Sequence, residues 1–260
     1  MGDFERDTAV DARGDGSFGC DLRPDWWVAG GPNGGYLGAI FVRALSADPG
    51  LGARPLRSIT LHYLGRPSEG PAEIQVEADR HGRSVSFIRA RLVQDGRLMT
   101  SAAAVFADER DGVELDQVDA PVVSGPDETA ELPDEPDGPP FSHQFDYRPA
   151  LGAPTFGGGD EALTGGWLRL RGERPLDAAA LVAFTDSWFP AVFAMRAEPL
   201  AVPTLELTVH LRDRLPREQD WAFGRYRTRL ARHGFLEEDS EIFSRNGELL
   251  AQGRQLAIAG

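Results

Sequence analysis

A single carboxylate lies within a long apolar stretch in the second half of the chain. Residues 178–195 are apolar on every side of a predicted helix that starts at residue 177, and Asp186 is their one charged residue. A buried carboxylate is unfavourable unless it is paired or used in chemistry. Pro190 has no N–H group, so we expect the helix to kink or loosen at the turn of Asp186. Asp186 is therefore a candidate proton acceptor, and an ordinary buried aspartate bonded to neighbouring hydroxyl groups is the alternative.

These residues belong to the second of two similar units, about 150 residues apart. Each unit has an apolar helix pattern, a strand that ends in His, a His-Gly pair, and an Asp-Gly or Asn-Gly pair followed by an apolar run. Three landmarks in the same order at nearly constant spacing indicate duplication of one unit. They are His62 and His210, His81-Gly82 and His233-Gly234, and Asp95-Gly96 and Asn246-Gly247.

Each unit is predicted to be a helix followed by antiparallel strands. In the first unit the helix covers 34–45, and strands are expected at 58–63, 72–78, 84–94 and 98–107. Asp-Gly and Asn-Gly between apolar runs are strong hairpin signals, because both central residues of a type I′ turn need positive φ. A helix followed by such strands implies a sheet wrapped over the helix, hence an α+β fold.

Three polar residues of the second unit have no polar counterpart in the first. The superposition places Asp186 near Gly38, Thr204 near Leu56 and Gln255 near Ala104. Scaffold residues should tend to occur in both copies, so this difference favours a site in the second unit. By strand alternation Gln255 projects from a small, apolar face, whereas Thr204 shares its face with Glu206, Thr208 and His210. Thr208 therefore remains an alternative to Thr204.

A glycine-rich segment, residues 30–35, precedes the first helix. Glycine lets the backbone approach a ligand closely, and a helix N-terminus presents unpaired N–H groups. The N–H groups near Gly34, Gly35 and Tyr36 are candidate oxyanion donors and substrate-binding groups. A tight turn beneath the sheet is the alternative.

Four motifs resemble the acyl-CoA thioesterase II (TesB-like) family of double hotdog proteins. They are Gly-Gly-Tyr-Leu-Gly at 34–38, His-Tyr-Leu-Gly-Arg-Pro at 62–67, Arg-His-Gly-Arg-Ser-Val-Ser-Phe at 80–87 and Gln-Asp-Gly-Arg-Leu at 94–98. The resemblance implies two hotdog units joined into one continuous sheet, and hydrolysis of acyl-CoA in lipid metabolism. It also implies an Asp, a Thr and a Gln that hold and polarise a water, at Asp186, Thr204 and Gln255.

We expect an N-terminal hotdog at 1–107, an acidic, proline-rich linker at 108–140 and a C-terminal hotdog at 141–260. The linker has few large apolar residues. The N-terminus lacks a signal-peptide pattern, no apolar run approaches the roughly 20 residues of a membrane span, and Cys20 is the only cysteine. These features predict a cytoplasmic protein without a membrane span or disulfide.

Composition also limits the partners. The net charge is −14 and all 27 basic residues are arginine, a balance that disfavours nucleic-acid binding. The five histidines show no metal-ligand spacing, so we expect no metal or cofactor.

The expected substrate is an acyl-CoA or acyl-carrier thioester of unspecified acyl group. A hotdog dehydratase or hydratase, which would need an Asp–His pair, and a non-catalytic acyl-CoA-binding protein are the alternatives. Open sheet edges make a homodimer plausible.

Overall fold

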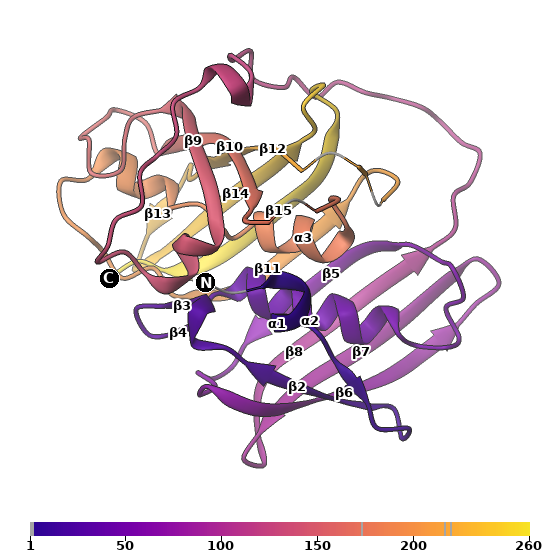
Figure 1. The fold of residues 1–260 in the computed structure, drawn as a ribbon. Coiled ribbons are helices and arrows are strands. Elements are labelled where there is room, and N and C mark those ends of the chain that lie inside the picture. The colour runs from indigo at the N-terminus through magenta and orange to yellow at the C-terminus, as the bar shows by residue number, and fades with distance from the viewer. Residues whose placement is uncertain (1–2, 173, 216, 219) are drawn as a thin grey trace.

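A single antiparallel sheet runs through both halves of the chain. The computed structural model describes residues 3–172, 174–215, 217–218 and 220–260. Within them the sheet has 13 strands, and the strand order is β1-β2-β6-β7-β8-β5-β11-β15-β14-β12-β10-β9, with β13 paired to β14. The two halves meet where β5 pairs with β11 (Figure 1). The strands on one side of this seam have counterparts on the other, which confirms the double hotdog architecture.

The first half contains α1 (Phe4–Asp7), β1 (Asp11–Ala12), β2 (Ser17–Leu22), η1 (Pro24–Trp26), β3 (Trp27–Val28), β4 (Gly31–Pro32), α2 (Gly34–Ser46), β5 (Leu56–Tyr63), β6 (Gly70–His81), β7 (Val85–Gln94) and β8 (Arg97–Ala107). The predicted helix and four strands of this half are present with nearly the expected bounds. The strand β2, which pairs with the outer side of β6, was not predicted.

The second half contains η2 (Pro126–Glu128), η3 (Pro140–Gln144), β9 (Phe145–Gly152), β10 (Leu163–Leu170), α3 (Ala178–Phe184), η4 (Ala191–Met195), β11 (Thr204–Leu211), β12 (Ala222–Arg227), β13 (Ala231–Arg232), β14 (Phe235–Phe243) and β15 (Leu249–Ile258). The helix expected over 177–195 is wrong in length. It ends at Phe184, and a short 3₁₀ helix follows Pro190. The N–H groups of Asp186 and Ser187 already bond three residues back, to Ala183 and Phe184, as in a closing 3₁₀ turn. Pro190 has no N–H for the carbonyl of Asp186, so the helix does not resume there.

The two helices lie inside the curve of the sheet, α2 against strands of the first half and α3 against strands of the second (Figure 1). They also pack directly on each other, and glycine permits this contact. A Cβ atom on Gly35 would lie 2.6 Å from the carbonyl oxygen of Ala183, and one on Gly38 would lie 2.7 Å from a methyl group of Val182. The small residues of the first helix therefore set the distance between the helices.

The seam is nearly symmetric. Thr60 on β5 lies opposite Thr208 on β11, and their hydroxyl oxygens are 2.9 Å apart. His62 and His210, the equivalent residues of the two units, lie on either side of this pair, opposite Glu206 and Ser58. The duplicated strand thus pairs with its own copy.

The segment that joins the halves, residues 108–125, has no helix or strand and runs along one side of the molecule (Figure 1). Its later part covers the face of the second half that is turned away from the helices. Val118 and Val123 pack against an aromatic cluster there, and the indole N–H of Trp167 donates to the carbonyl of Ser124 at 2.8 Å. The segment therefore contributes to the packing of the second half although its composition is acidic and rich in proline.

Candidate active site

Asp186 lies in a turn whose backbone is held by side chains from the surrounding elements. α3 begins at the N-cap Asp177, whose carboxylate accepts from the N–H of Ala180 at 2.7 Å, and ends just before Thr185. The last carbonyls of a helix have no partner within the helix. In this turn the hydroxyl group of Tyr226 donates to the carbonyl of Phe184 at 2.6 Å. These contacts fix the position from which the Asp186 side chain projects.

Two more contacts complete the turn. The hydroxyl group of Tyr147 donates to the carbonyl of Ser187 at 2.7 Å. The side-chain N–H of Asn33 donates to the carbonyl of Asp186 at 2.8 Å. Asn33 is the N-cap of α2, so the first half of the chain holds the turn of the second half.

The Asp186 carboxylate points toward the N-terminus of α2. Its Oδ2 atom accepts from the N–H of Gly35 at 2.9 Å and from the side-chain N–H of Asn33 at 3.1 Å. A Cβ atom on Gly34 would lie 2.9 Å from the same oxygen, so a larger residue at that position would have to displace the carboxylate. The helix N-terminus suits a carboxylate, because its unpaired N–H groups carry partial positive charge.

Two effects oppose each other at Asp186. Burial of the carboxylate disfavours its charged form and raises its pKa from the ordinary 3.8 to about 6. Hydrogen bonds from the Gly35 and Gly34 backbone, Asn33 and Gln255 act in the opposite direction and keep the pKa from rising further. The residue as a whole is half-buried, whereas its carboxylate group is desolvated. Asp186 is thus a desolvated carboxylate that is ionised at neutral pH.

Gln255 and Thr204 lie together beside this carboxylate. The Thr204 hydroxyl group donates to Oε1 of Gln255 at 2.6 Å, and the Gln255 carboxamide lowers the pKa of Asp186. Gln255 is buried on the inner face of β15, as the alternation predicted. The structure therefore brings the three predicted residues into one cluster.

The face predicted for Thr204 was wrong, because a β-bulge interrupts the alternation of β11. The register shifts between Thr204 and Glu206, and Thr204 pairs with Ala257, which shares the face of Gln255. Without the extra residue Thr204 would point to the outer face. Thr208 does lie on that outer face, where it contacts Thr60 and accepts no bond from Gln255 in the described residues.

A second buried carboxylate, which the sequence analysis missed, contacts Gln255. Glu238 on β14 is 4 % exposed, and its Oε1 atom accepts from Nε2 of Gln255 at 3.0 Å. Its Oε2 atom accepts from the N–H of Ala191 at 2.5 Å. Burial raises the pKa of Glu238 to about 7. The alternation of β14 gave a weak signal, since Glu238 shares one parity in the sequence with Leu236, Ser240 and Ile242, a set of four with two apolar residues and no other charge.

The N–H groups proposed as oxyanion donors already have acceptors in the protein. The N–H of Gly35 donates to Asp186, and the N–H of Tyr36 donates to the side-chain oxygen of Asn33 at 2.9 Å. The Tyr36 side chain is fully buried and stacks on Trp26 with ring centroids 5.1 Å apart. The backbone of this segment therefore positions Asp186 and caps α2, which corrects the expectation of free donors at Gly35 and Tyr36.

Asn33 and Tyr63 are the other neighbours of the cluster that the sequence analysis did not single out. The Tyr63 hydroxyl group donates to the carbonyl of Gly34 at 2.9 Å, and burial raises the pKa of the phenol, with the nearby Asp186 charge adding to the shift. Asn33 lies in the glycine-rich segment 30–35, and Tyr63 directly follows His62 in the motif at 62–67. Their proximity to Asp186 arises from the packing of α2 on α3, which no local pattern reports.

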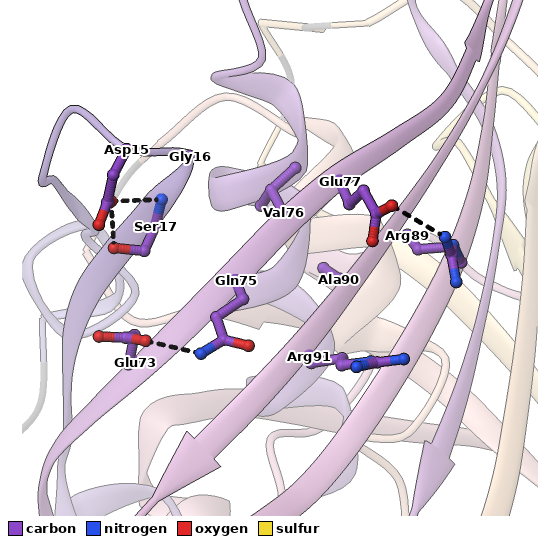
Figure 2. Close-up of a pocket in the computed structure, with 10 residues that line it drawn as sticks. All are labelled: Asp15, Gly16, Ser17, Glu73, Gln75, Val76, Glu77, Arg89, Ala90 and Arg91. Atoms are coloured by element: carbon purple, nitrogen blue, oxygen red, sulfur yellow. Dashed lines mark hydrogen bonds and ion pairs between the residues drawn. The ribbon is translucent and has the colours of Figure 1, made fainter.

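An open pocket of about 310 Å³ lies elsewhere, on the strands β2, β6 and β7 (Figure 2). It is lined by Asp15, Gly16, Ser17, Glu73, Gln75, Val76, Glu77, Arg89, Ala90 and Arg91. Its polar groups largely bind one another: Arg89 pairs with Glu77 at 3.2 Å, and the Gln75 amide donates to Glu73 at 2.9 Å. None of the predicted site residues lines it, so we do not assign the chemistry to this pocket.

In the described part of the chain, no group of His, Cys, Asp or Glu residues could hold a metal ion. No helix of that part has the length and apolar character needed to cross a membrane.

Comparison with known proteins assigns the family. The model of the acyl-CoA thioesterase N-terminal domain matches residues 23–107, and the model of the acyl-CoA thioesterase C-terminal domain matches residues 123–259. The chain belongs to the acyl-CoA thioesterase family. Its activity is thioester hydrolysis, and the cluster around Asp186 is the candidate active site of this thioesterase. No curated protein matched the sequence.

Solved structures confirm the fold of the thioesterase. A conserved hot dog protein of unknown function from Alicyclobacillus acidocaldarius has a TM-score of 0.91 and 25% identity, over 99% of this chain and 97% of that chain. The tesB protein of Mycobacterium avium subspecies paratuberculosis gives 0.80 and 19%, over 99% and 98%. An acyl-CoA thioesterase II from Mycobacterium marinum gives 0.77 and 18%, also over 99% and 98%. The similarity extends over both halves in each case.

Proposed function

We propose that Asp186, Thr204 and Gln255 position the water that attacks the thioester. The observation that carries the proposal is the arrangement of acceptors. The proton of Thr204 is used in the bond to Gln255, so the oxygen of Thr204 is left to accept. A water that donates one hydrogen to Asp186 and the other to Thr204 would direct a lone pair away from both, toward a substrate carbonyl.

Each step then has a named group. The water oxygen forms a bond to the carbonyl carbon while its proton passes to the Asp186 carboxylate. The tetrahedral intermediate collapses with cleavage of the C–S bond, and the leaving thiolate takes up the proton held by Asp186, which restores the carboxylate. A pKa of about 6 leaves Asp186 ionised at neutral pH yet more basic than an ordinary carboxylate, as a general base requires.

The proposed substrate is an acyl-CoA or an acyl-carrier thioester. We propose that the backbone at Gly34 and Gly35 forms the wall beside the reacting carbonyl, because glycine leaves room there that a side chain would fill. Tyr36 supports this wall from the core and is not proposed to touch the substrate. A dehydratase is not favoured, because the hydrogen-bond partners described for the Asp186 carboxylate are amides and include no histidine.

Thiol release from a panel of acyl-CoA and acyl-carrier thioesters tests the proposal. The wild-type protein should turn over at least one of them, and Asp186→Asn should bind it but release thiol far more slowly. Saturable binding without turnover by the wild type would contradict the proposal and favour a non-catalytic binding protein. Full activity of the variant would remove Asp186 from the mechanism.

We also propose that the thioesterase works in the cytoplasm, in lipid metabolism, as a homodimer. Cys20, the only cysteine, is a buried free thiol, which suits a reducing compartment. β9 lies at the end of the sheet with one edge unpaired in the described residues, and open edges favour pairing between copies. The mass in solution, measured by light scattering, tests the dimer.

A further inference from the structure

Glu238 is a buried carboxylate that the mechanism above does not use. It lies on the inner face of β14 and takes part in no salt bridge among the described residues. Its carboxylate accepts hydrogen bonds from two N–H groups, one of the Gln255 side chain and one of the Ala191 backbone. Burying a charge without an opposite charge costs free energy, and an apolar residue at the same position would often make the protein as stable or more stable. Stability alone therefore does not account for a glutamate at position 238.

The two contacts suit a carboxylate. Each oxygen of Glu238 faces an N–H donor, and a carboxylate accepts at both oxygens. Burial acts in the opposite direction and raises the pKa of Glu238 to about 7, so the group is a carboxylate above that pH.

The same contacts define the orientation of the Gln255 amide. The oxygen and nitrogen ends of a carboxamide have nearly the same shape, so packing alone does not distinguish them. Thr204 does not decide the orientation, because a hydroxyl group can donate or accept. Glu238 does decide it, because a carboxylate only accepts and so requires the nitrogen end of Gln255, and the Asp186 carboxylate, whose pKa the same amide lowers, favours the same end.

We propose that Glu238 is a positioning residue of the thioesterase, which holds Gln255 with its nitrogen inward and thereby leaves the Thr204 oxygen free to accept from the attacking water. Through Ala191 it also fixes the segment that follows the Asp186 turn. The inference rests on the proposed function of Thr204 and Gln255. If the amide turned over, its N–H would occupy one of the two lone pairs of the Thr204 oxygen, and the Thr204 proton would be free to point at the attacking water instead of at Gln255.

Glu238→Gln tests the proposal with little change of volume. The new amide can satisfy Gln255 or Ala191 as an acceptor but not both, so of the two carboxylates only Asp186 still selects the nitrogen end of Gln255, and the turned-over amide becomes more accessible. We expect kcat to fall about 10- to 100-fold, the loss that corresponds to one hydrogen bond to a charged group, with KM nearly unchanged. Glu237→Gln is the matched control, because it removes the same charge one residue away on the other side of β14, and its activity should equal that of the wild type.

A double-mutant cycle separates positioning from a general structural role. If Glu238 acts through Gln255, then Glu238→Gln should have no further effect on kcat in a Gln255→Ala background. The same fold loss in both backgrounds would overturn the proposal, as would wild-type kcat for Glu238→Gln. If Glu238→Gln fails to fold, Glu238→Asp keeps the charge but not the reach, and should show the same loss of kcat; wild-type kcat in Glu238→Asp would overturn the proposal.

A readout independent of turnover separates this inference from the proposed function. The side-chain amide resonance of Gln255, assigned by its loss in Gln255→Ala, should shift in Glu238→Gln and stay in place in Glu237→Gln. If the wild type hydrolyses no thioester but the resonance shifts, the proposed function fails and the positioning contact stands. An unshifted resonance in Glu238→Gln would overturn the positioning contact itself.

Discussion

Asp186→Asn should lower activity and at the same time raise stability. The asparagine oxygen can take the place of Oδ2 and keep the bonds from Gly35 and Asn33. Its nitrogen then replaces the other carboxylate oxygen, which can no longer accept a proton from water. Removal of a general base costs about 10²- to 10⁴-fold in rate. We therefore expect a fall of at least about 100-fold in kcat, with little change in KM.

The stability effect follows from the direction of the pKa shift. The pKa of Asp186 is raised in the folded state, so the unfolded chain ionises more readily and ionisation destabilises the fold. The free energy of unfolding is therefore highest, as far as Asp186 is concerned, below the ordinary pKa of 3.8, and it falls as the pH rises to about 6. The difference between the two values corresponds to about 3 kcal/mol, and solvent access to the half-buried residue reduces it to about 1–3 kcal/mol.

Two assays check this prediction. Thiol release gives kcat as a function of pH: the wild type should lose activity as the pH falls through about 6, where Asp186 takes up a proton. Urea unfolding gives the free energy of unfolding, which should be higher for Asp186→Asn than for the wild type above pH 6 and should converge at low pH. Asp111→Asn, an exposed change in the joining segment, serves as the control. A variant that is fully active, or less stable than the wild type at neutral pH, would refute the reasoning.

Three other changes test the surroundings of Asp186. Thr204→Val should lower kcat about tenfold or more through loss of the proposed acceptor, whereas Thr208→Val should leave kcat within about twofold of the wild type; equal effects of the two would contradict the assignment. Asn33→Ala removes a donor that lowers the pKa of Asp186, so the acid limb of the pH–rate profile should move to higher pH, and an unmoved limb would count against the contact. Gly35→Ala places a Cβ atom 2.6 Å from the carbonyl oxygen of Ala183, so the free energy of unfolding, measured by thermal unfolding, should fall by about 1–3 kcal/mol. Wild-type stability of this variant would contradict the close helix contact.

The architecture was largely predictable because its determinants repeat along the chain. His62 and His210 belong to landmarks that recur at nearly constant spacing, and in the structure the two histidines lie symmetrically about the Thr60–Thr208 contact. Alternation and turn residues act locally, so they locate strands well. The isolated charge of Asp186 in an apolar stretch was likewise visible, since burial follows from composition over a few residues.

The arrangement of the site was decided by tertiary structure. The bulge in β11 moves Thr204 to the face of Gln255, and only the pairing with β15 reveals it. Asn33 and Glu238 reach the site from elements distant in the sequence, through helix packing and through the neighbouring strand. The sequence by itself determined the repeated helix-and-sheet units and the residue types available for chemistry. The tertiary structure decided which of those residues meet and how they are oriented, through contacts between the two halves and between paired strands. The reason is that a hydrogen bond needs two atoms within about 3 Å of each other, and sequence spacing alone does not bring residues of different elements that close.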